Sequence, residues 1–498
     1  MRGSPEVFSD FKGGVNLEAA PYSLDINQAR DALNVHTSPV GAVVKRFGCN
    51  PISSPSVVFN SLFGVRLATP VLLAQGGTKF YKVIASSGTT SELETEVTPT
   101  ENVHWDFIQA PVKEAKGPIF GVNGTDTNIY WDGTTGKVKK WEGGGVPKGK
   151  YIEYHENRVY IAKGSTLYWS EIINPFNFES PKGGSTEVDP EDGQEITGLG
   201  KVGPYLLIFK NRKTFILTDS NNGYYRRISD DMGCASNRSI VSTEAGTFFM
   251  TEDSEIVLTN GSSFERLVHR PVEPLLKKLS GTTKPKVCGV HEGDLVYFSI
   301  SQGGSVNDTI LEYNIVDNSW WIHKISYSSS ETGGVNQFVL LDVSSVAKIF
   351  GAGSNTSVKR VFDMFLEDRY TDVTVFKTEW KPPWLVFGAP HVNKRIREIR
   401  VDAYGDFTLV SYNSFSSTPS EEDVVYWETT AEEGYWEEET SEKWEESSEE
   451  LWGGESAISE RRYPTIGVGR AWSFNFISET SLPLQIFSYT VAAQMRKD

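Results

Sequence analysis

Apolar residues between Tyr151 and Leu267 occur in short runs or alternate with polar residues, with almost no helical spacing between them. Polar turn pairs separate these runs, as expected for consecutive β-hairpins. A long series of hairpins needs an arrangement that hides its strand edges, and radial repetition about an axis is one of the few available. The pattern therefore predicts a β-propeller. The turn pairs are Glu156-Asn157, Asn211-Arg212, Ala245-Gly246, Asp253-Ser254 and Asn260-Gly261.

Candidate blades recur along the chain with a loose period of about 40 residues, which is within the range of propeller repeats. The number of blades that the pattern supports is five to seven. A helix-like stretch at 272–279 is expected to connect two of them. The candidate blades are residues 62–85, 103–141, 151–200, 205–230, 238–268, 287–325 and 337–375.

The regions that flank the blades differ from them in pattern, so we expect an all-β chain of three parts. Residues 1–50 resemble an extended arm, in which Val40 to Phe47 could supply the strand that closes the propeller. Residues 51–375 form the propeller itself. Longer alternating strands in residues 376–498 predict a β-sandwich or jelly-roll-like module.

An acidic insertion at residues 421–460 interrupts this last module. It contains sixteen carboxylates and one lysine, Lys443. Tryptophans recur in it every eight or nine residues, which returns a strand residue to the same face. The spacing of its carboxylates and glycines does not match a calcium-binding loop. The tryptophans are Trp427, Trp436, Trp444 and Trp452, and the densest glutamates are Glu437, Glu438, Glu439, Glu445 and Glu446.

Two interpretations of this insertion remain open. In the first, it is an ordered acidic protrusion whose four indoles contact a neighbouring subunit, so they are candidate assembly contacts, and its glutamates line a channel or a surface. In the second, it is a flexible acidic loop whose tryptophans dock on the parent domain.

Charge and cysteine content restrict the class of protein. The formal net charge of −17 argues against tight wrapping of nucleic acid but permits a nucleic acid to pass. Cys49, Cys234 and Cys288 are few and far apart, which indicates buried thiols and assembly inside a cell. The sequence predicts neither a signal peptide nor a membrane-spanning segment.

The chain lacks the motifs of the common catalytic sites. Its seven histidines never occur in zinc-binding contexts, and no nucleophile elbow or phosphate-binding loop is present. Sialidase-type boxes are also absent, and acidic pairs are too numerous to indicate a glycosidase. We therefore expect a protein without catalytic activity, cofactor or metal.

Five motifs follow one another along residues 11–260. They are FKGGVN at 11–16, QARDALNV at 28–35, VVKRFGC at 43–49, YWSEIINPFNF at 168–178 and GCASNRSIV at 233–241. In this order they resemble a family of bacteriophage tail proteins that includes the propeller-bearing hub or nozzle proteins of short-tailed phages. The acidic insertion has no counterpart in that resemblance.

The resemblance implies a structural virion protein of the phage tail, assembled in the host cytoplasm. Such proteins form a ring, typically a homo-hexamer, below the portal and the adaptor or head-to-tail connector, and above the tail fibres, spike or needle. The ring extends the exit channel for double-stranded DNA and helps to retain and then release the genome. The acidity is consistent with this role, because negative walls repel phosphates within a Debye length of about 8–10 Å.

Two other functions remain possible from the sequence. Exposed aromatic residues and carboxylates also suit a tail-tip receptor-binding propeller that binds or cleaves a host surface glycan. A cellular kelch-like scaffold would need repeated kelch signatures, and the chain has one weak trace, around Tyr313 and Trp320.

Overall fold

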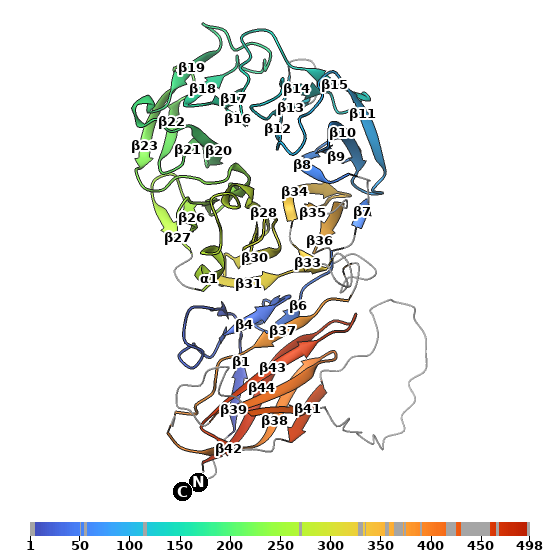
Figure 1. Cartoon of the computed structure of the whole chain (residues 1–498), viewed down its shortest axis with the longest axis vertical. Helices are drawn as coiled ribbons and strands as arrows, with labels where there is room; N and C mark the ends of the chain where they lie inside the picture. Colours follow the sequence, from blue (N-terminus) through green and yellow to red (C-terminus); the bar gives the residue numbers. More distant parts are fainter. Residues whose placement is uncertain are drawn as a thin grey trace. The chain divides into compact units, whose positions relative to one another are not determined.

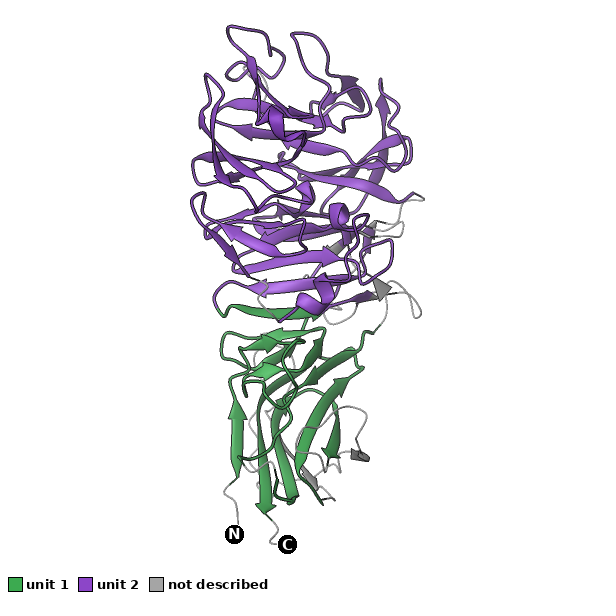
Figure 2. Cartoon of the chain, turned by 60° about the vertical axis from the view of Figure 1, so that its left-hand side comes forward, with its two compact units in different colours: residues 1–46, 317–322, 375–498 green, residues 47–316, 323–374 purple. Residues whose placement is uncertain are grey.

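The chain divides into two compact units, which are described separately below (Figure 2). One unit comprises Phe47–Val316 and His323–Thr374, and the other comprises Met1–Arg46, Asp317–Ile322 and Val375–Asp498. The computed structural model describes residues 5–49, 51–53, 57–112, 117–267, 271–326, 332–333, 335–353, 358–362, 372, 375–388, 391–414, 425–429, 459–464 and 468–495.

The larger unit is a β-propeller. Its first two blades are antiparallel sheets of four strands, and parallel pairing of β11 with β15 joins them into one eight-stranded sheet. Blade 1 contains β8 (Phe59–Val65), β9 (Val71–Gly76), β10 (Lys79–Ile84) and β11 (Thr90–Thr95). Blade 2 contains β12 (Asp106–Gln109), β13 (Ile119–Val122), β14 (Ile129–Trp131) and β15 (Lys137–Lys140).

The next three blades repeat the same four-stranded meander. Blade 3 contains β16 (Tyr151–His155), β17 (Arg158–Lys163), β18 (Thr166–Trp169) and β19 (Gly184–Glu187). Blade 4 contains β20 (Ile196–Val202), β21 (Tyr205–Lys210), β22 (Thr214–Asp219) and β23 (Tyr224–Ser229). Blade 5 contains β24 (Val241–Thr243), β25 (Gly246–Met250), β26 (Ile256–Thr259) and β27 (Phe264–Arg266).

The last two blades bring the number within the described residues to seven, at the upper end of the predicted range. The strand order of the sheet of blade 6 is β28 (Cys288–Glu292), β29 (Leu295–Ile300), β30 (Thr309–Asn314) and β31 (Ser319–His323), and most of β31 lies within the segment Asp317–Ile322 of the smaller unit. Blade 7 is β34 (Val335–Val343), β35 (Val346–Gly353), β36 (Val358–Val361) and β7 (Pro51–Ser53). The prediction of an all-β propeller is confirmed, and the predicted helix is one turn, α1 (Glu273–Leu276).

The hydrophobic core of the propeller lies between blades. Ile108 and Phe120 of blade 2, for example, share a cluster with Val159 and Ile161 of blade 3. Because both faces of a blade are covered in this way, a strand such as β9 is buried at every residue. This packing explains why many strands appear in the sequence as apolar runs and not as strict alternation. The predicted boundary of the candidate blade 151–200 is wrong, because β20, which begins at Ile196, pairs with β21 and belongs to blade 4.

The smaller unit is a β-sandwich of two sheets. The seven-stranded sheet has the order β41-β38-β44-β6-β5, with β1 on β44 and β42 on β38. The five-stranded sheet has the order β4-β37-β43-β39-β40. The strands are β1 (Glu6–Ser9), β4 (Asp31–Leu33), β5 (Val35–Thr37), β6 (Val43–Lys45), β37 (Thr378–Lys381), β38 (Lys394–Tyr404), β39 (Thr408–Ser414), β40 (Val425–Thr429), β41 (Ser459–Pro464), β42 (Val468–Gly469), β43 (Ala471–Ser478) and β44 (Gln485–Met495).

Aromatic side chains fill the space between the two sheets. The ring of Tyr489, on β44, lies 5.9 Å from Trp380 of β37 and 5.8 Å from Phe476 of β43. Phe11, from the N-terminal arm, packs 4.6 Å from Trp380. Aromatic pairs at these separations add stability beyond the area that they bury.

The prediction that Val40 to Phe47 closes the propeller is wrong. Val43–Lys45 pairs with β5 and with β44, so this part of the arm belongs to the sandwich. The strand that completes blade 7 is β7, where Ser53 lies opposite Val358. The arm and residues 375–498 consequently form one folded unit, whereas the sequence had suggested two separate parts. The two alternatives could not be distinguished locally, because each strand has a similar alternation of apolar and polar residues.

Gly88 provides a test of this closure. It adopts a φ of +71°, and a Cβ there would come within 1.5 Å of the carbonyl oxygen of Ile52 on β7. Gly203 has a φ of +53° with no atom within 4 Å of its Cβ position, so it is a matched control. Alanine at either position costs about 1–2 kcal/mol because of the left-handed backbone. We expect Gly88→Ala to lower the free energy of unfolding by about 1–3 kcal/mol more than Gly203→Ala, since β7 must shift.

Urea unfolding of the two variants measures this difference. Equal losses for Gly88→Ala and Gly203→Ala would show that the contact with β7 does not contribute to stability.

Candidate functional site in the propeller channel

The inner strands of the blades surround a central cavity of about 870 Å³. Figure 1 shows β8, β12, β16, β20, β28 and β34 arranged around the centre of this unit. Polar and charged side chains from several blades line the cavity together with aromatic ones. The polar and charged lining residues include Arg66, His104, Asp106, Gln109, Glu153, Lys201, Asn237, Arg238, Ser242 and Gln337.

The inner strand of each blade has one edge without a partner strand, so its backbone groups need other hydrogen-bond partners. Side chains of the neighbouring blade provide them. The backbone N–H of Trp105 donates to Ser61 Oγ at 2.7 Å, and that of Ile152 donates to Asp106 Oδ2 at 3.0 Å. The N–H of Leu199 donates to Asn237 Oδ1 at 3.1 Å.

The inner-edge carbonyl groups are used in the same way. Lys201 Nζ donates to the carbonyl oxygen of Tyr154 at 3.1 Å, and Ser242 Oγ donates to that of Lys201 at 2.7 Å. Ser236 Oγ donates to the carbonyl of Val287 at 2.7 Å. Each of these bonds joins one blade to the next, so polar residues near the axis connect neighbouring blades.

A single 3₁₀ turn, Asn237–Ser239, crosses the cavity at the end where the inner strands begin. Asn237 Nδ2 donates to Asp106 Oδ2 at 3.0 Å, which links the start of blade 5 to blade 2. Arg238 donates to the carbonyl oxygen of Asn336, on β34 of blade 7, at 3.3 Å and to that of Pro285 at 2.9 Å. These bonds obstruct this end of the channel.

Burial raises the pKa of Asp106 to about 7, and the nearby charge of Glu153 adds to the effect, although the N–H donors of Ile152 and Asn237 oppose it. Burial also lowers the pKa of His104 to about 3, with a contribution from the positive charge of Arg238. His104 is therefore neutral near pH 7. Glu153 forms an ion pair with Lys201 at 3.0 Å.

The polar groups of the cavity mainly form hydrogen bonds between blades, and Ser61 Oγ also lies 3.2 Å from His104 Nδ1, which is 3.0 Å from the carbonyl oxygen of Asn60. Cys234, close to the 3₁₀ turn, is a buried thiol whose pKa is raised to about 12 by that burial, so it is not a nucleophile at neutral pH. Among the described residues, no group of three His, Cys, Asp or Glu side chains could hold a metal ion. Within that same part of the chain, no helix has the length and apolar character needed to span a bilayer.

The sequence had directed attention to a different region. Of the predicted site residues, Trp427 lies on β40, where its backbone pairs with that of Ser411. The others, which are Trp436, Trp444, Trp452, Glu437, Glu438, Glu439, Glu445 and Glu446, lie outside the described residues.

Sequence reasoning missed the channel residues. One local signal was available for Asp106, which is an acidic residue between Trp105 and Phe107 within a predicted blade. A second was available for Asn237, which falls within the GCASNRSIV motif. Nothing in the sequence indicated that these two residues meet, because 131 positions separate them.

No protein-family model matches the chain, and no curated protein matches it. Similar solved structures include U3-55K, at 9% identity over 64% of this chain and 98% of that chain, with a TM-score of 0.41. A chain of the mitotic checkpoint complex is similar at 12% identity over 66% and 96%, with a TM-score of 0.42. YCF48 from Cyanidioschyzon merolae is similar at 8% identity over 63% and 98%, with a TM-score of 0.41. These likenesses concern the fold alone.

The pKa of Asp106 predicts a pH-dependent stability. A carboxyl whose pKa is raised from 3.8 to about 7 in the folded protein stabilises the fold while it is protonated, and this contribution is lost as the pH rises toward 7. Asp106→Asn lacks this titration. We therefore expect the melting temperature of the natural protein, relative to Asp106→Asn, to fall between about pH 4 and pH 7 and to stay level above that range. The exposed Asp253→Asn serves as the control, and a difference that is constant with pH would contradict the assignment.

Asn237 should contribute to stability through both of its bonds. Asn237→Ala leaves the N–H of Leu199 without an acceptor and removes the link to Asp106, so we expect it to lower the free energy of unfolding by about 1–3 kcal/mol. Asn222, whose side chain donates to Asp219 in an exposed turn, is a control that should change stability by less than about 0.5 kcal/mol. Chemical denaturation measures both changes. An Asn237→Ala variant with an unchanged free energy of unfolding would show that the hydrogen bonds of Asn237 do not stabilise the propeller.

Proposed function

We propose that this protein is a structural subunit of a ring-shaped tail hub or nozzle of a short-tailed bacteriophage, without catalytic turnover. The observation that carries the proposal is the ordered series of five motifs. Their residues make packing contacts and hydrogen bonds that connect structural elements of the fold. The motifs do not converge on one reactive site.

The N-terminal motifs hold the sandwich together. Phe11 is buried between Trp380 and Tyr489, with ring centroids 4.6 Å and 6.0 Å away. Arg46 Nε donates to Asn34 Oδ1 at 2.9 Å, and the Arg46 guanidinium lies 3.7 Å from the centre of the Phe376 ring. These residues belong to the motifs FKGGVN, QARDALNV and VVKRFGC. The residues that carry the resemblance therefore also make contacts that keep the sandwich rigid.

The two later motifs connect blades of the propeller. Phe176 and Phe178, from YWSEIINPFNF in blade 3, join the hydrophobic cluster of blade 2 around Phe120 and Trp141. Trp141 Nε1 also donates to the carbonyl oxygen of Pro175 at 3.1 Å. GCASNRSIV supplies the crossing turn described above. Rigid junctions of this kind are what a subunit of a ring would need, whereas an enzyme would also need a reactive cluster.

The proposed DNA path is the axis of the assembled ring and not the channel of one propeller. Asp106 and Asn237 hydrogen-bond across that channel, so a nucleic acid could not pass through it. In a head-to-tail ring, the outer surfaces of successive subunits would surround the DNA. An adaptor or connector above and fibres, a spike or a needle below are the partners proposed for its two faces in the virion tail.

The negative charge is concentrated in one segment. With sixteen carboxylates and one lysine, residues 421–460 carry a net charge of −15, so the remainder of the chain carries −2 of the total −17. The proposed repulsion between ring and DNA would therefore come from the acidic segment, because the rest of the protein is nearly neutral.

The assembly state tests this proposal. We expect light scattering of the purified protein, alone or with its adaptor ring, to give six times the 55.4 kDa subunit mass. No hydrolysis of host polysaccharide should accompany assembly. A stable monomer that ignores the adaptor and binds host polysaccharide would overturn the proposal in favour of a receptor-binding propeller.

A further inference from the structure

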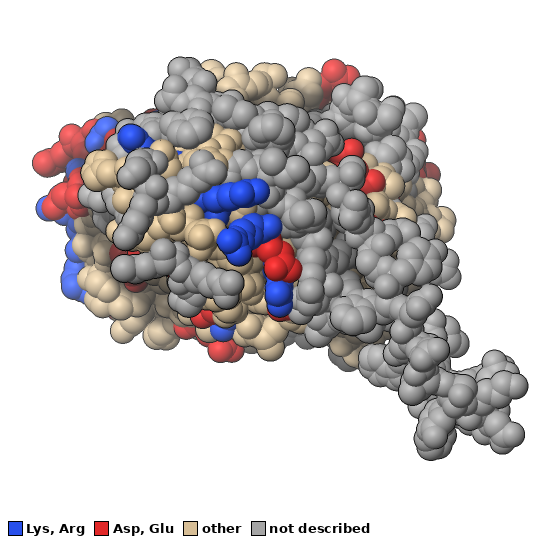
Figure 3. All heavy atoms as spheres, turned by 90° about the horizontal axis from the view of Figure 1, so that it is seen from below, with Lys and Arg blue, Asp and Glu red and all other residues tan. Residues whose placement is uncertain are grey.

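One charged side chain that lines the propeller channel lacks a counter-ion. Arg238, in the crossing turn, forms no ion pair within the described part of the chain, and its two hydrogen bonds go to carbonyl oxygens. On the surface drawn in colour in Figure 3, by contrast, Lys and Arg side chains lie beside Asp and Glu side chains. Burial lowers the pKa of Arg238, because a desolvated charge is costly unless an anion accompanies it.

The guanidinium of Arg238 also has donors to spare. Of the five N–H groups of an arginine side chain, one on Nη1 donates to the carbonyl oxygen of Asn336 and one on Nη2 to that of Pro285. The other three, including the N–H of Nε, have no acceptor among the residues that the structure describes. The two carbonyl groups therefore fix the position of the guanidinium without neutralising its charge.

Two acceptor atoms without donors lie on side chains that line the same cavity. Gln337 follows Asn336 at a bulge in the pairing of β34 with β35, and its Oε1 is buried without a hydrogen-bond partner. His104 Nδ1 lies 3.0 Å from the carbonyl oxygen of Asn60, which can only accept, so the proton is on Nδ1. His104 Nε2 is then an acceptor, and it has no partner in the described residues.

These three side chains are close to one another. Arg238 donates to Asn336, the neighbour of Gln337 in the sequence. The charge of Arg238 also contributes to the low pKa of His104, which is about 3, so the imidazole stays neutral near pH 7. One cationic donor and two neutral acceptors therefore gather at the obstructed end of the channel.

The carboxyl groups of the cavity lining do not balance its positive charges. Glu153 is paired with Lys201 at 3.0 Å. Asp106 Oδ2 already accepts two hydrogen bonds, and burial raises the pKa of Asp106 to about 7, so a large fraction of this group is protonated near neutral pH. Arg66, a second lining arginine, has no ion pair with any described residue and is exposed just beyond the end of β8.

The remainder of the cavity is suitable for a small molecule. Its volume of about 870 Å³ is within the range of about 300–1,000 Å³ that is typical of ligand pockets. Phe63, Tyr154 and Leu340 contribute apolar surface to its walls. The crossing turn obstructs one end, so the channel is a pocket and not a passage.

We propose that the channel binds a small organic acid that carries hydroxyl groups, such as a uronic acid, with its carboxylate on the guanidinium of Arg238. Hydroxyl groups of the ligand donate to Gln337 Oε1 and His104 Nε2, and its carbon skeleton lies against Phe63 and Tyr154. A carboxylate matches the forked N–H groups of arginine. Sulfate would supply the negative charge but not the donors that the two acceptors need.

The inference goes beyond the proposed function and does not depend on it. The cavity lies within a single propeller, so a monomer and each subunit of a ring would contain the same site. Binding requires no turnover. The acid could be free in solution or the end of an acidic glycan chain, since both present the same carboxylate and hydroxyl groups.

Calorimetric titration of the purified full-length chain with glucuronate tests the site. We expect saturable binding of one glucuronate per chain. Glucose, which lacks the carboxylate, and sulfate, which lacks hydroxyl groups, should each bind at least about tenfold more weakly, because each loses one set of hydrogen bonds.

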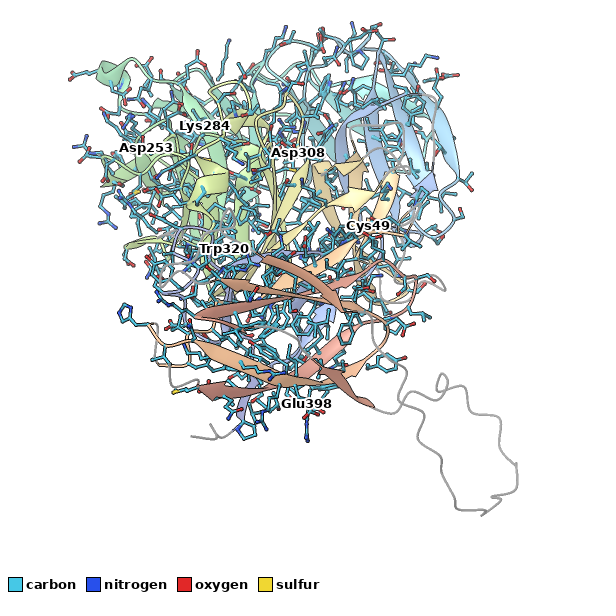
Figure 4. The ribbon with its side chains drawn as sticks, turned by 60° about the horizontal axis from the view of Figure 1, so that its bottom comes forward. Cys49, Asp253, Lys284, Asp308, Trp320 and Glu398 are labelled. Carbon is cyan, nitrogen blue, oxygen red and sulfur yellow. The ribbon has the colours of Figure 1, made fainter. Side chains whose placement is uncertain are left out.

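Two substitutions locate the binding. Arg238→Met should lower the affinity for glucuronate at least about tenfold, to that for glucose, and melting curves verify that the variant is folded. Gln337→Glu keeps the bonds of Arg238 and places a carboxylate near it, so it should weaken glucuronate binding to a similar extent and raise the melting temperature. Arg212→Gln is the matched control, because Arg212 is exposed outside the cavity, 3.4 Å from Asp253, which Figure 4 labels. It should leave the affinity unchanged.

Three results would each overturn the proposal. They are the absence of saturable glucuronate binding up to about 10 mM, equal affinities for glucuronate and glucose, and an unchanged affinity in both the Arg238→Met and the Gln337→Glu variant. A disaccharide that ends in glucuronate distinguishes the two sources. Binding at least as tight as that of the free acid supports the end of a glycan chain, and weaker binding supports a free acid. None of these results alters the mass expected for the assembled ring, so the two proposals fail independently.

Discussion

The propeller depends on how the inner edges of its blades are satisfied. Each inner strand has a row of backbone donors and acceptors without a partner strand, and burying such groups unpaired costs about 1–3 kcal/mol each. Here the side chains of adjacent blades provide the missing partners, among them Ser61, Asp106 and Lys201. Because the bonds run from blade to blade, the same residues that satisfy the edges also hold the ring together. The channel is consequently polar for structural reasons, and its polarity alone does not indicate a substrate.

The sandwich depends on the two ends of the chain in a comparable way. Phe8 of β1 stacks on Tyr489 of β44 at 4.7 Å, so the first and last strands of the protein share one aromatic core. Removing either terminus would expose this core. The propeller closes with β7, which follows the arm directly, and the two units are thus each completed by residues that are distant in sequence.

The charge of the protein is distributed very unevenly. Residues 421–460 carry −15 of the net charge of −17, and the rest of the chain is close to neutral. Whole-chain net charge therefore describes this protein poorly. A uniformly acidic surface and a neutral body with one acidic segment have the same net charge, but they present different fields to a passing polyanion.

The sequence by itself determined the class of fold and the approximate position of each blade, because strand alternation, apolar runs and turn residues are local properties. It also determined where the charge lies and that the three cysteines are buried thiols. Only the tertiary structure decided that Val43–Lys45 joins the sandwich while Pro51–Ser53 closes the propeller, since hydrogen-bond partners in a sheet are not encoded in either strand alone. The same holds for the meeting of Asp106 with Asn237. Their contact arises from the closure of the propeller, which brings blades 2 and 5 to a common axis. No periodic pattern along the sequence indicates that these two residues are close.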